Sequence, residues 1–375
     1  MSGSTHTPAK AEAGTASAAV QTWAAAWPLS DHTVTVVLSA AAGAPETSLP
    51  VVIYLPGLGQ TSDAGELWRA RWASAGYAVV SVQPLADDAN AWASELARAG
   101  EFRALGEQRY GADAMERRLR ALGEVVAQGR ARTAAGEVAW RAVDWQRVAL
   151  AGYDLGAYAA MVAAGERGRD TGQVGVVLPV RAVLALSPYA HPGAADADRR
   201  YEAIRAAVLS VTSDVDNDVL GRWRGVAERR VPFEHLSGAV NDLLTLQGLP
   251  HAGLSGDLRD LTPARERVAV LRARDGTGAG DDAPSQRSRN GRSRVQSSGA
   301  DDRSVEVAGG VGLLAVTQAR ERVALAQDLS VRFLDAYVRE DAGARHWLGA
   351  EVAGWLGARG TWVRAARAPA GAAAR

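Results

Sequence analysis

Residues 147–157 read Arg-Val-Ala-Leu-Ala-Gly-Tyr-Asp-Leu-Gly-Ala and carry the strongest signal for the fold. An apolar run leads into the pattern Gly-x-Asp-x-Gly, and an alanine-rich segment follows it. A strand, a sharp turn and a helix in this order form a nucleophile elbow, where only small residues fit two places before and after the apex. Gly152 and Gly156 occupy those places and Asp154 stands at the apex. The sequence therefore predicts that the Asp154 carboxylate projects into an active site.

Short apolar runs alternate with helix-favouring segments along the rest of the chain. Strands are expected at His32–Ala40, Leu49–Leu55, Tyr77–Val82, Gln146–Ala151, Val180–Leu186, Ala206–Thr212 and Asp242–Gln247. Helical patterns cover Ser62–Ala75, Ala93–Gln128 and Thr317–Val338. Continuous apolar strands are typical of parallel sheets that are buried on both faces. The alternation predicts an α/β fold with a mostly parallel central sheet and helices on both faces.

One large domain is predicted between two less structured ends. The chain has 375 residues, 47% of them hydrophobic, which is ample for one core. Residues 1–28 have the composition of a flexible leader, residues 29–350 form the domain, and residues 351–375 read as an Ala/Arg-rich tail. Residues 274–300 lack large apolar side chains except Val295, which predicts a disordered insertion in the domain.

The charge balance and the absence of cysteine exclude several classes of function. Lys and Arg total 42 and Asp and Glu total 42, so no basic field would attract nucleic acid or an anionic membrane. Without cysteine there is no disulfide, thiol nucleophile or thiolate metal site. No segment approaches the ~20 apolar residues of a membrane span, and Gln21 and Thr22 interrupt the N-terminal apolar run. We expect a cytoplasmic protein whose oligomeric state remains open.

Two loops at the carboxyl ends of predicted strands carry side chains that would serve Asp154. The loop after Ala206–Thr212 is acidic, and the loop after Asp242–Gln247 carries His251. On such folds the chain order is nucleophile, acid, histidine. We therefore expect an Asp-His-Asp triad in which His251 is the base. Asp216 is the preferred acid, and Asp214 and Asp218 are the alternatives.

Backbone N–H groups around the apex predict an oxyanion hole. The turn after the second expected strand is rich in glycine, which lets the backbone approach a ligand. The expected donors are the N–H groups of Leu155 and Leu58, with Gly57 and Tyr153 beside them in the substrate site. The run Gly57–Gly59 lacks the rest of a dinucleotide fingerprint, and no metal-ligand spacing is convincing. No cofactor and no metal is expected.

Together these features resemble the α/β-hydrolase superfamily, in particular platelet-activating-factor-acetylhydrolase-like and dienelactone-hydrolase-like proteins. The matching stretches are Val52–Gly59, Gly76–Val82, residues 147–157, Leu184–Tyr189, Pro250–Asp257, and Phe333–Tyr337 with Trp347-Leu348. The resemblance runs from about residue 30 to about residue 350 without the insertion, and it implies a small-molecule substrate of unspecified identity. The family usually has His-Ser where this chain has Tyr153-Asp154, so its catalytic serine has no counterpart here. It also usually has His-Gly where this chain has Pro56-Gly57.

The aspartate changes the chemistry that such a site can perform. Asp154 precedes a helix and is expected to be ionised. An adduct with an ester carbonyl would return mostly to substrate, because a carboxylate leaves more readily than an alkoxide. Attack at the saturated carbon of an epoxide or alkyl halide gives an alkyl–enzyme ester, which His251 and water would hydrolyse. We therefore expect a hydrolase for a small apolar electrophile of this kind.

Haloalkane dehalogenases and epoxide hydrolases use an elbow aspartate in this way, and the chain resembles them only at the elbow. Leu155 stands where dehalogenases usually have a halide-binding Trp, and no inserted cap domain is evident. Tyr110 and Tyr189 are candidates for the tyrosines that protonate the departing oxygen in epoxide hydrolases. Two alternatives remain open: a general-base lyase or cyclase in the same cavity, and an inactive homologue of a serine esterase. The second is reasonable because Asp tolerates left-handed backbone better than most residues.

Overall fold

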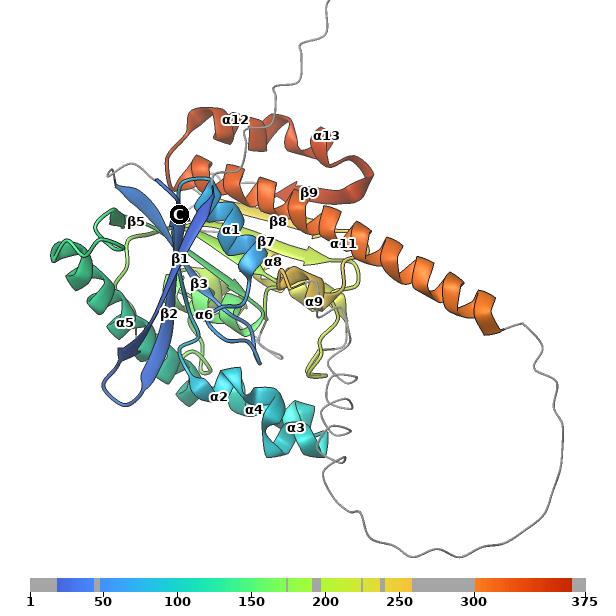
Figure 1. Ribbon diagram of the computed structural model, residues 1–375, viewed down its shortest axis with the longest axis horizontal. Coiled ribbons are helices and arrows are strands. Elements are labelled where there is room, and N and C mark those ends of the chain that lie inside the picture. Colours follow the sequence, from blue (N-terminus) through green and yellow to red (C-terminus); the bar gives the residue numbers. More distant parts are fainter. Residues whose placement is uncertain are drawn as a thin grey trace, which may run out of the picture.

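The chain folds around one β-sheet (Figure 1). The structure is a computed structural model, and it describes residues 19–43, 48–172, 175–190, 197–223, 225–236, 240–257 and 301–365. The strands are β1 (Val20–Pro28), β2 (Thr33–Ala41), β3 (Leu49–Leu55), β4 (Ala78–Val82), β5 (Val143–Tyr153), β6 (Val180–Leu186), β7 (Ala207–Ser213), β8 (Asn241–Leu246) and β9 (Gly360–Arg364). Their order in the sheet is β1-β2-β4-β3-β5-β6-β7-β8-β9. Neighbouring strands from β4 to β8 are parallel, whereas β1, β2 and β9 add antiparallel pairs at the edges.

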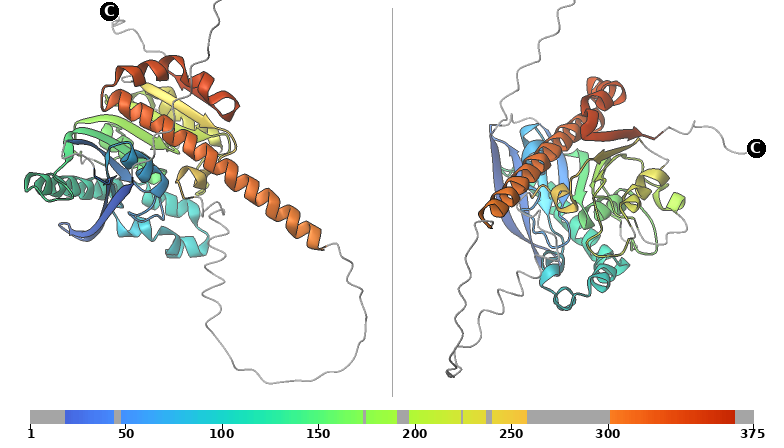
Figure 2. Two further views of the ribbon diagram at one scale, coloured as in Figure 1. Left: turned by 45° about the horizontal axis from the view of Figure 1, so that its top comes forward. Right: turned by 90° about the vertical axis from the view of Figure 1, so that its right-hand side faces the viewer.

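Helices cover both faces of the sheet and divide the core into two layers. The helices are α1 (Glu66–Ser74), α2 (Ala86–Ala89), α3 (Glu95–Ala99), α4 (Phe102–Arg109), α5 (Ala112–Ala134), α6 (Leu155–Ala164), α7 (Ala197–Tyr201), α8 (Val231–His235), α9 (His251–Leu254), α11 (Asp301–Tyr337), α12 (Ala342–Ala350) and α13 (Val352–Leu356). Side chains of α5 and α6 form the core on one face. Side chains of α1, α11 and α12 form the core on the other, where Figure 2 shows α11 lying along the sheet. The predicted α/β fold, a mostly parallel sheet between two helical layers, is confirmed.

The strand order places a topological switch point between β3 and β5. From β3 the chain goes to β4 on one side and then returns to β5 on the other side of β3. Loops at the carboxyl ends of strands diverge at such a point and leave a crevice in which α/β proteins bind ligands. The β3–α1 loop and the turn at Asp154 border this crevice, because Leu55 pairs with Gly152 in the sheet. The fold thus brings together the loops that carry the predicted site residues.

Both predicted ends of the domain were wrong. Residues 20–28, assigned to the flexible leader, form β1, and the ring of Trp27 packs 5.0 Å from that of Trp140. β1 escaped prediction because it is an edge strand with mostly exposed alanines and no continuous apolar run. The first part of the predicted tail forms α13 and β9, which pairs with β8 and carries Arg364 to an ion pair with Asp242.

Helix bounds depart from the predictions where glycines or loops intervene. The single helical region expected over Ala93–Gln128 is divided into α3, α4 and α5, with breaks at Gly100, whose φ is +80°, and at Gly111. α1 begins at Glu66 instead of Ser62, and α11 begins at Asp301 instead of Thr317. The predicted insertion at 274–300 lies outside the described residues. Among the described residues, no helix is both long and apolar enough to cross a bilayer.

Candidate active site

The turn from Gly152 to Gly156, called here the Asp154 turn, holds its apex in an uncommon backbone conformation. Asp154 has φ 52° and ψ −111°, and it is only 6% exposed. A Cβ on Gly156 would lie 1.9 Å from the Leu55 carbonyl oxygen, and a Cβ on Gly152 would lie 2.3 Å from the Gly156 backbone. The two glycines therefore permit the close packing of β3, β5 and α6 that forces the apex outward. The Asp154 side chain makes no capping hydrogen bond to α6, so its carboxylate is available to the site.

The structure brings His251 and Asp216 together at the ends of β8 and β7. Nδ1 of His251 lies 2.7 Å from Oδ1 of Asp216, and this shortest contact assigns the proton to Nδ1. Asp216 is fully buried and also accepts hydrogen bonds from the hydroxyls of Ser187, at 2.9 Å, and Thr212, at 2.8 Å. Burial alone would raise the pKa of Asp216, but the charge of Arg229 and these hydrogen bonds hold it below its usual value. Asp216 is thus an ionised acceptor that orients the imidazole.

The two alternative acids lie in turns away from His251. Asp214 accepts a hydrogen bond from the N–H of Gly248 at 2.7 Å and joins the two loops. Asp218 accepts hydrogen bonds from the N–H groups of Leu220 and Trp223, both at 2.9 Å. Each of these carboxylates satisfies backbone donors, as acids in turns commonly do. Of the three candidates, Asp216 is the one that contacts the imidazole.

A buried arginine stands between the two carboxylates of the site. Arg229 precedes α8 and is 1% exposed. Its Nη1 atom lies 3.9 Å from Oδ1 of Asp154, and its Nε atom lies 3.5 Å from Oδ1 of Asp216. The guanidinium also donates to the carbonyl oxygens of Ser187 and Pro188 and stacks 4.1 Å from the centre of the Trp223 ring. One fixed positive charge therefore serves two carboxylates that would otherwise be buried without a counter-ion.

Two buried tyrosine hydroxyls near Asp154 lack hydrogen bonds of standard geometry. Tyr110 and Tyr189 pack with ring centres 4.3 Å apart, and both hydroxyls are buried without a partner of standard geometry among the described residues. The Tyr110 hydroxyl interacts with the Asp154 carboxylate; burial and then this charge raise the pKa of Tyr110 well above its usual value. Burial likewise raises the pKa of Tyr189. Both groups therefore remain protonated phenols.

Asp154 and His251 border one small cavity of about 50 Å³. We call it the inner cavity; its lining residues are Leu58, Gly59, Gln60, Trp92, Tyr153, Asp154, Val219, His251, Ala252 and Ser255. Apart from the carboxylate and the imidazole, most of this wall is apolar or backbone. Nε2 of His251 has no hydrogen-bond partner among the described residues, because the bonded ring nitrogen is Nδ1. The Asp154 carboxylate and the imidazole of His251 therefore border the same small cavity.

The predicted backbone donors lie next to this cavity. Neither Leu58 nor Leu155 donates its N–H to a carbonyl or side chain among the described residues. A Cβ on Gly57 would lie 2.6 Å from the Tyr153 ring, so this glycine lets the β3–α1 loop pack against the Asp154 turn. The Tyr153 hydroxyl donates to the carbonyl oxygen of His251 at 3.1 Å, which links the Asp154 turn to the start of α9. Two unpaired N–H groups therefore remain beside Asp154.

A buried ion pair fixes the loop that carries Leu58. Arg118 of α5 donates to both carboxylate oxygens of Asp88, at 2.6 and 2.8 Å, and both side chains are buried. The backbone carbonyl of Asp88 accepts a hydrogen bond from the N–H of Gly59 at 2.8 Å. Gly59 has φ +80°, and its face is covered by the Trp92 ring. Buried contacts in the core therefore fix the orientation of the loop that carries Leu58.

The predicted residues Asp154, Asp216 and His251 lie close together in the structure, with Arg229 and Ser187, which the sequence analysis did not single out. A signal for Ser187 was present, because it directly follows β6 at the edge where the other site residues lie. Arg229 had no comparable signal, since it belongs to an arginine-rich segment between β7 and β8 with no apolar period. The described residues contain no group of three or more His, Asp or Glu side chains that would hold a metal ion.

Comparison with known proteins adds no assignment to this geometry. No protein-family model matches the chain, and no curated protein is significantly similar to it in sequence.

Proposed function

We propose that the protein is an α/β-hydrolase-type enzyme that hydrolyses a small epoxide through a covalent ester at Asp154. The observation that carries the proposal is that Asp154 and His251 border the same inner cavity, with His251 held by the buried Asp216. A carboxylate at such an apex favours attack on saturated carbon over attack on an ester carbonyl. A histidine with a free Nε2 then supplies the base for the second half of the reaction.

In the first step an Asp154 oxygen bonds to one epoxide carbon, and the carbon–oxygen bond of the ring breaks. The departing oxygen takes the proton of the Tyr110 phenol, which interacts with Asp154 and has no ordinary hydrogen bond to lose. The product is a neutral hydroxyalkyl ester. Alkylation moves one of the two buried negative charges from Asp154 to the Tyr110 oxygen and leaves Asp216 paired with Arg229.

In the second step His251 takes a proton from water, and the hydroxide adds to the carbonyl carbon of the ester. The oxyanion that forms on Asp154 would accept hydrogen bonds from the N–H groups of Leu155 and Leu58, which make no other hydrogen bond among the described residues. Collapse breaks the acyl–oxygen bond, and the diol oxygen takes the proton from His251. The new acid proton on Asp154 returns to Tyr110, so one epoxide and one water give one diol with every group restored.

Epoxides are favoured over alkyl halides by the state of two hydrogen-bond donors near Asp154, namely Trp92 and Tyr110. The Trp92 indole is not free to bind a departing halide, because it already donates to the carbonyl of Leu58 at 3.2 Å. An epoxide oxygen needs a proton, and a phenol whose pKa is raised keeps its proton for that purpose. Tyr110, packed against Tyr189, supplies this group next to Asp154.

Turnover of simple terminal epoxides in heavy-oxygen water tests the proposal. Trypsin cleavage after Arg147 and Arg167 yields the peptide Val148–Arg167, and fragmentation separates Asp154 from Glu166 within it. We expect the labelled oxygen in Asp154, and we expect Asp154→Asn to abolish both turnover and labelling. Turnover without label would exclude covalent attack and leave a general-base lyase or cyclase reaction. Absence of turnover across epoxides of graded size would contradict the enzyme and favour an inactive homologue.

A further inference from the structure

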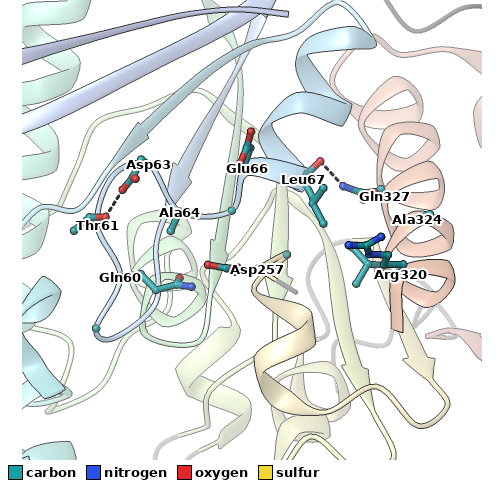
Figure 3. A pocket seen from close by; sticks show the side chains of 14 residues that line it. Gln60, Thr61, Asp63, Ala64, Glu66, Leu67, Asp257, Arg320, Ala324 and Gln327 are labelled. Carbon is teal, nitrogen blue, oxygen red and sulfur yellow. Dashed lines mark hydrogen bonds between the residues drawn. The ribbon is translucent and has the colours of Figure 1, made fainter. Parts of the chain in front are cut away.

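A second, much larger cavity of about 670 Å³ is shown in Figure 3. We call it the outer pocket; its residues come from the loop Gly59–Leu67, from Gly256 and Asp257 after α9, and from α11. Its volume falls in the range of about 300–1,000 Å³ typical of small-molecule sites. Gly59 and Gln60 line both cavities. The two cavities therefore meet at Gly59 and Gln60, and Asp154 lines the inner one.

The difference in size divides any substrate into two parts. The inner cavity, at about 50 Å³, accommodates only a small reactive group such as a three-membered ring. The rest of the molecule must then lie in the outer pocket. Its wall combines apolar side chains, such as Leu67 and Val323, with several charged and amide side chains. The polar residues are Gln60, Thr61, Asp63, Glu66, Asp257, Arg320 and Gln327.

The charges of this wall favour a cation. Asp63, Glu66 and Asp257 contribute three carboxylates, against one guanidinium from Arg320. In Figure 3, Gln60, Asp63 and Asp257 lie on one side of the pocket, and Arg320 lies on the opposite side, on α11. Glu66 lies between these carboxylates and Leu67, so all three carboxylates lie apart from Arg320 in this view. A positive group on the substrate would be attracted to them.

The acidic wall is held in place before any ligand binds. Arg69 lies beneath it, 6% exposed, and donates to the backbone carbonyls of Ala64, at 2.9 Å, and Asp63, at 2.6 Å. Ser62 accepts a hydrogen bond from the N–H of Gln83 at 2.8 Å. Arg69 does not line the pocket, but its charge interacts with Glu66 and Asp63 and offsets part of the negative charge of the wall. A wall fixed in this way loses little conformational freedom on binding, which favours affinity.

We propose that the outer pocket binds the body of the substrate and that this body carries an ammonium group, joined by a short chain to the reactive ring. The identification of the ring as an epoxide rests on the proposed function, whereas the cation site rests on the outer pocket alone. The enzyme would thus act on amino- or trialkylammonio-epoxides in preference to neutral ones of the same shape.

Matched probes separate charge from shape. The substrates are terminal epoxides that carry a trimethylammonium group on chains of increasing length, each paired with its neutral tert-butyl isostere. The corresponding diols serve as unreactive ligands for titration calorimetry on the full chain. We expect the best cationic diol to bind at least about tenfold more tightly than its isostere at low salt. Added salt should reduce this preference.

Charge-removing variants locate the preference. Glu66→Gln or Asp63→Asn should each weaken binding of the cationic diol about threefold, and the double variant about tenfold. Glu351→Gln removes an exposed carboxylate that does not line the pocket and should have no effect. Binding of the neutral diol should be unchanged in all variants.

The outcomes distinguish this proposal from the epoxide hydrolase assignment. Selective binding of the cationic diol without turnover of either epoxide supports the cation site and contradicts the proposed reaction. Turnover of both epoxides with equal KM supports the reaction and overturns the cation site. Equal affinity for the two diols, no detectable binding of the cationic diol, or equal loss in Glu351→Gln also overturns it.

Discussion

The guanidinium of Arg229 lies 3.9 Å from the Asp154 carboxylate, entirely inside the protein. It also lies 3.5 Å from Asp216, and Nη2 lies 3.2 Å from Nδ1 of His251. Asp154 and Asp216 carry two negative charges, and Arg229 supplies one positive charge between them. Breaking a buried ion pair by removing one partner is far more damaging than removing both, because the remaining charge stays buried.

Replacing the shared cation tests this arrangement. Arg229→Met keeps most of the side-chain volume but leaves two buried carboxylates without a counter-ion. We expect it to lower the free energy of unfolding by about 3–5 kcal/mol at neutral pH, measured by urea denaturation. Arg229→Lys retains the charge, but one ammonium group cannot reproduce the separate contacts of Nη1 with Asp154 and Nε with Asp216, so an intermediate loss is expected. Wild-type stability in Arg229→Met would show that the charges are not paired in the folded protein.

His251 variants should stop the proposed reaction at the ester. Because attack by Asp154 needs no base, His251→Ala should still react once with an epoxide and then fail to hydrolyse the product. Intact-protein mass spectrometry should show one added substrate mass, located in the peptide Val148–Arg167. The double variant with Asp154→Asn should show no adduct. Multiple turnovers by His251→Ala would mean that another group activates water.

Removal of the Tyr110 hydroxyl should slow ring opening without harming the fold. Tyr110→Phe deletes a buried hydroxyl that makes no ordinary hydrogen bond, so stability should change by less than about 1 kcal/mol. We expect kcat for epoxides to fall about 100-fold, in keeping with the loss of a general acid. Tyr54→Phe is a matched control, because its hydroxyl is also buried without a partner but belongs to β3 and does not contact Asp154. Equal effects of the two changes would argue against a proton donor at Tyr110.

The sheet was predictable from sequence because its central strands bury both faces. Continuous apolar runs give Leu49–Leu55 and Val180–Leu186 the same bounds in the structure as in the prediction. Edge strands lack this signal, so β1 and β9 were missed: their burial comes from single side chains such as Trp27 and from pairing with a partner strand. Pairing with a strand that is distant in the sequence leaves no pattern in the local sequence.

The candidate site was predictable only where a residue follows a strand. Asp154, Asp216 and His251 all stand at carboxyl ends of parallel strands, and chain order suggested their association. The preference for Asp216 over Asp214 was not secured by sequence, since both lie in one acidic loop and only the fold directs one of them to His251. Arg229 lies in the segment before α8 and pairs with the buried carboxylates of Asp154 and Asp216. The need for this counter-ion follows from the three-dimensional structure and not from the local sequence.

Two glycines of the Asp154 turn should be intolerant of a methyl group. Gly156→Ala would place its Cβ 1.9 Å from the Leu55 carbonyl oxygen, and backbone cannot yield as a side chain can. We expect a loss of at least about 3 kcal/mol or failure to fold, measured by thermal or urea unfolding. Gly123→Ala is the control, because this glycine of α5 has open space around its Cβ position. It should gain about 0.5–1 kcal/mol from better helix propensity. Similar stability of the two variants would contradict the packing described for the turn.

Glu166, which follows α6, should lower the free energy of unfolding as the pH rises towards and through neutrality. It is fully buried, and burial raises its pKa to about 7 despite an ion pair with Arg200 at 2.5 Å. The ordinary value is 4.5, so between 4.5 and about 7 the folded state holds a proton that the unfolded state has lost. Stability therefore falls as pH rises across this window, by on the order of 3 kcal/mol once the side chain is charged in both states.

The variant Glu166→Gln isolates this contribution. Below pH 4.5 the native side chain is neutral in both states, so the variant and the wild type should have similar free energies of unfolding. Above pH 7 the variant avoids a buried charge while its amide oxygen can still accept from Arg200, so it should be the more stable protein. Subtracting the two urea-unfolding series cancels the contributions of all other titrating groups. The control is Glu202→Gln, at an exposed neighbour of Arg200, which should show no such pH-dependent difference. A variant less stable than the wild type at pH 8 would mean that the ion pair with Arg200 outweighs the burial of Glu166.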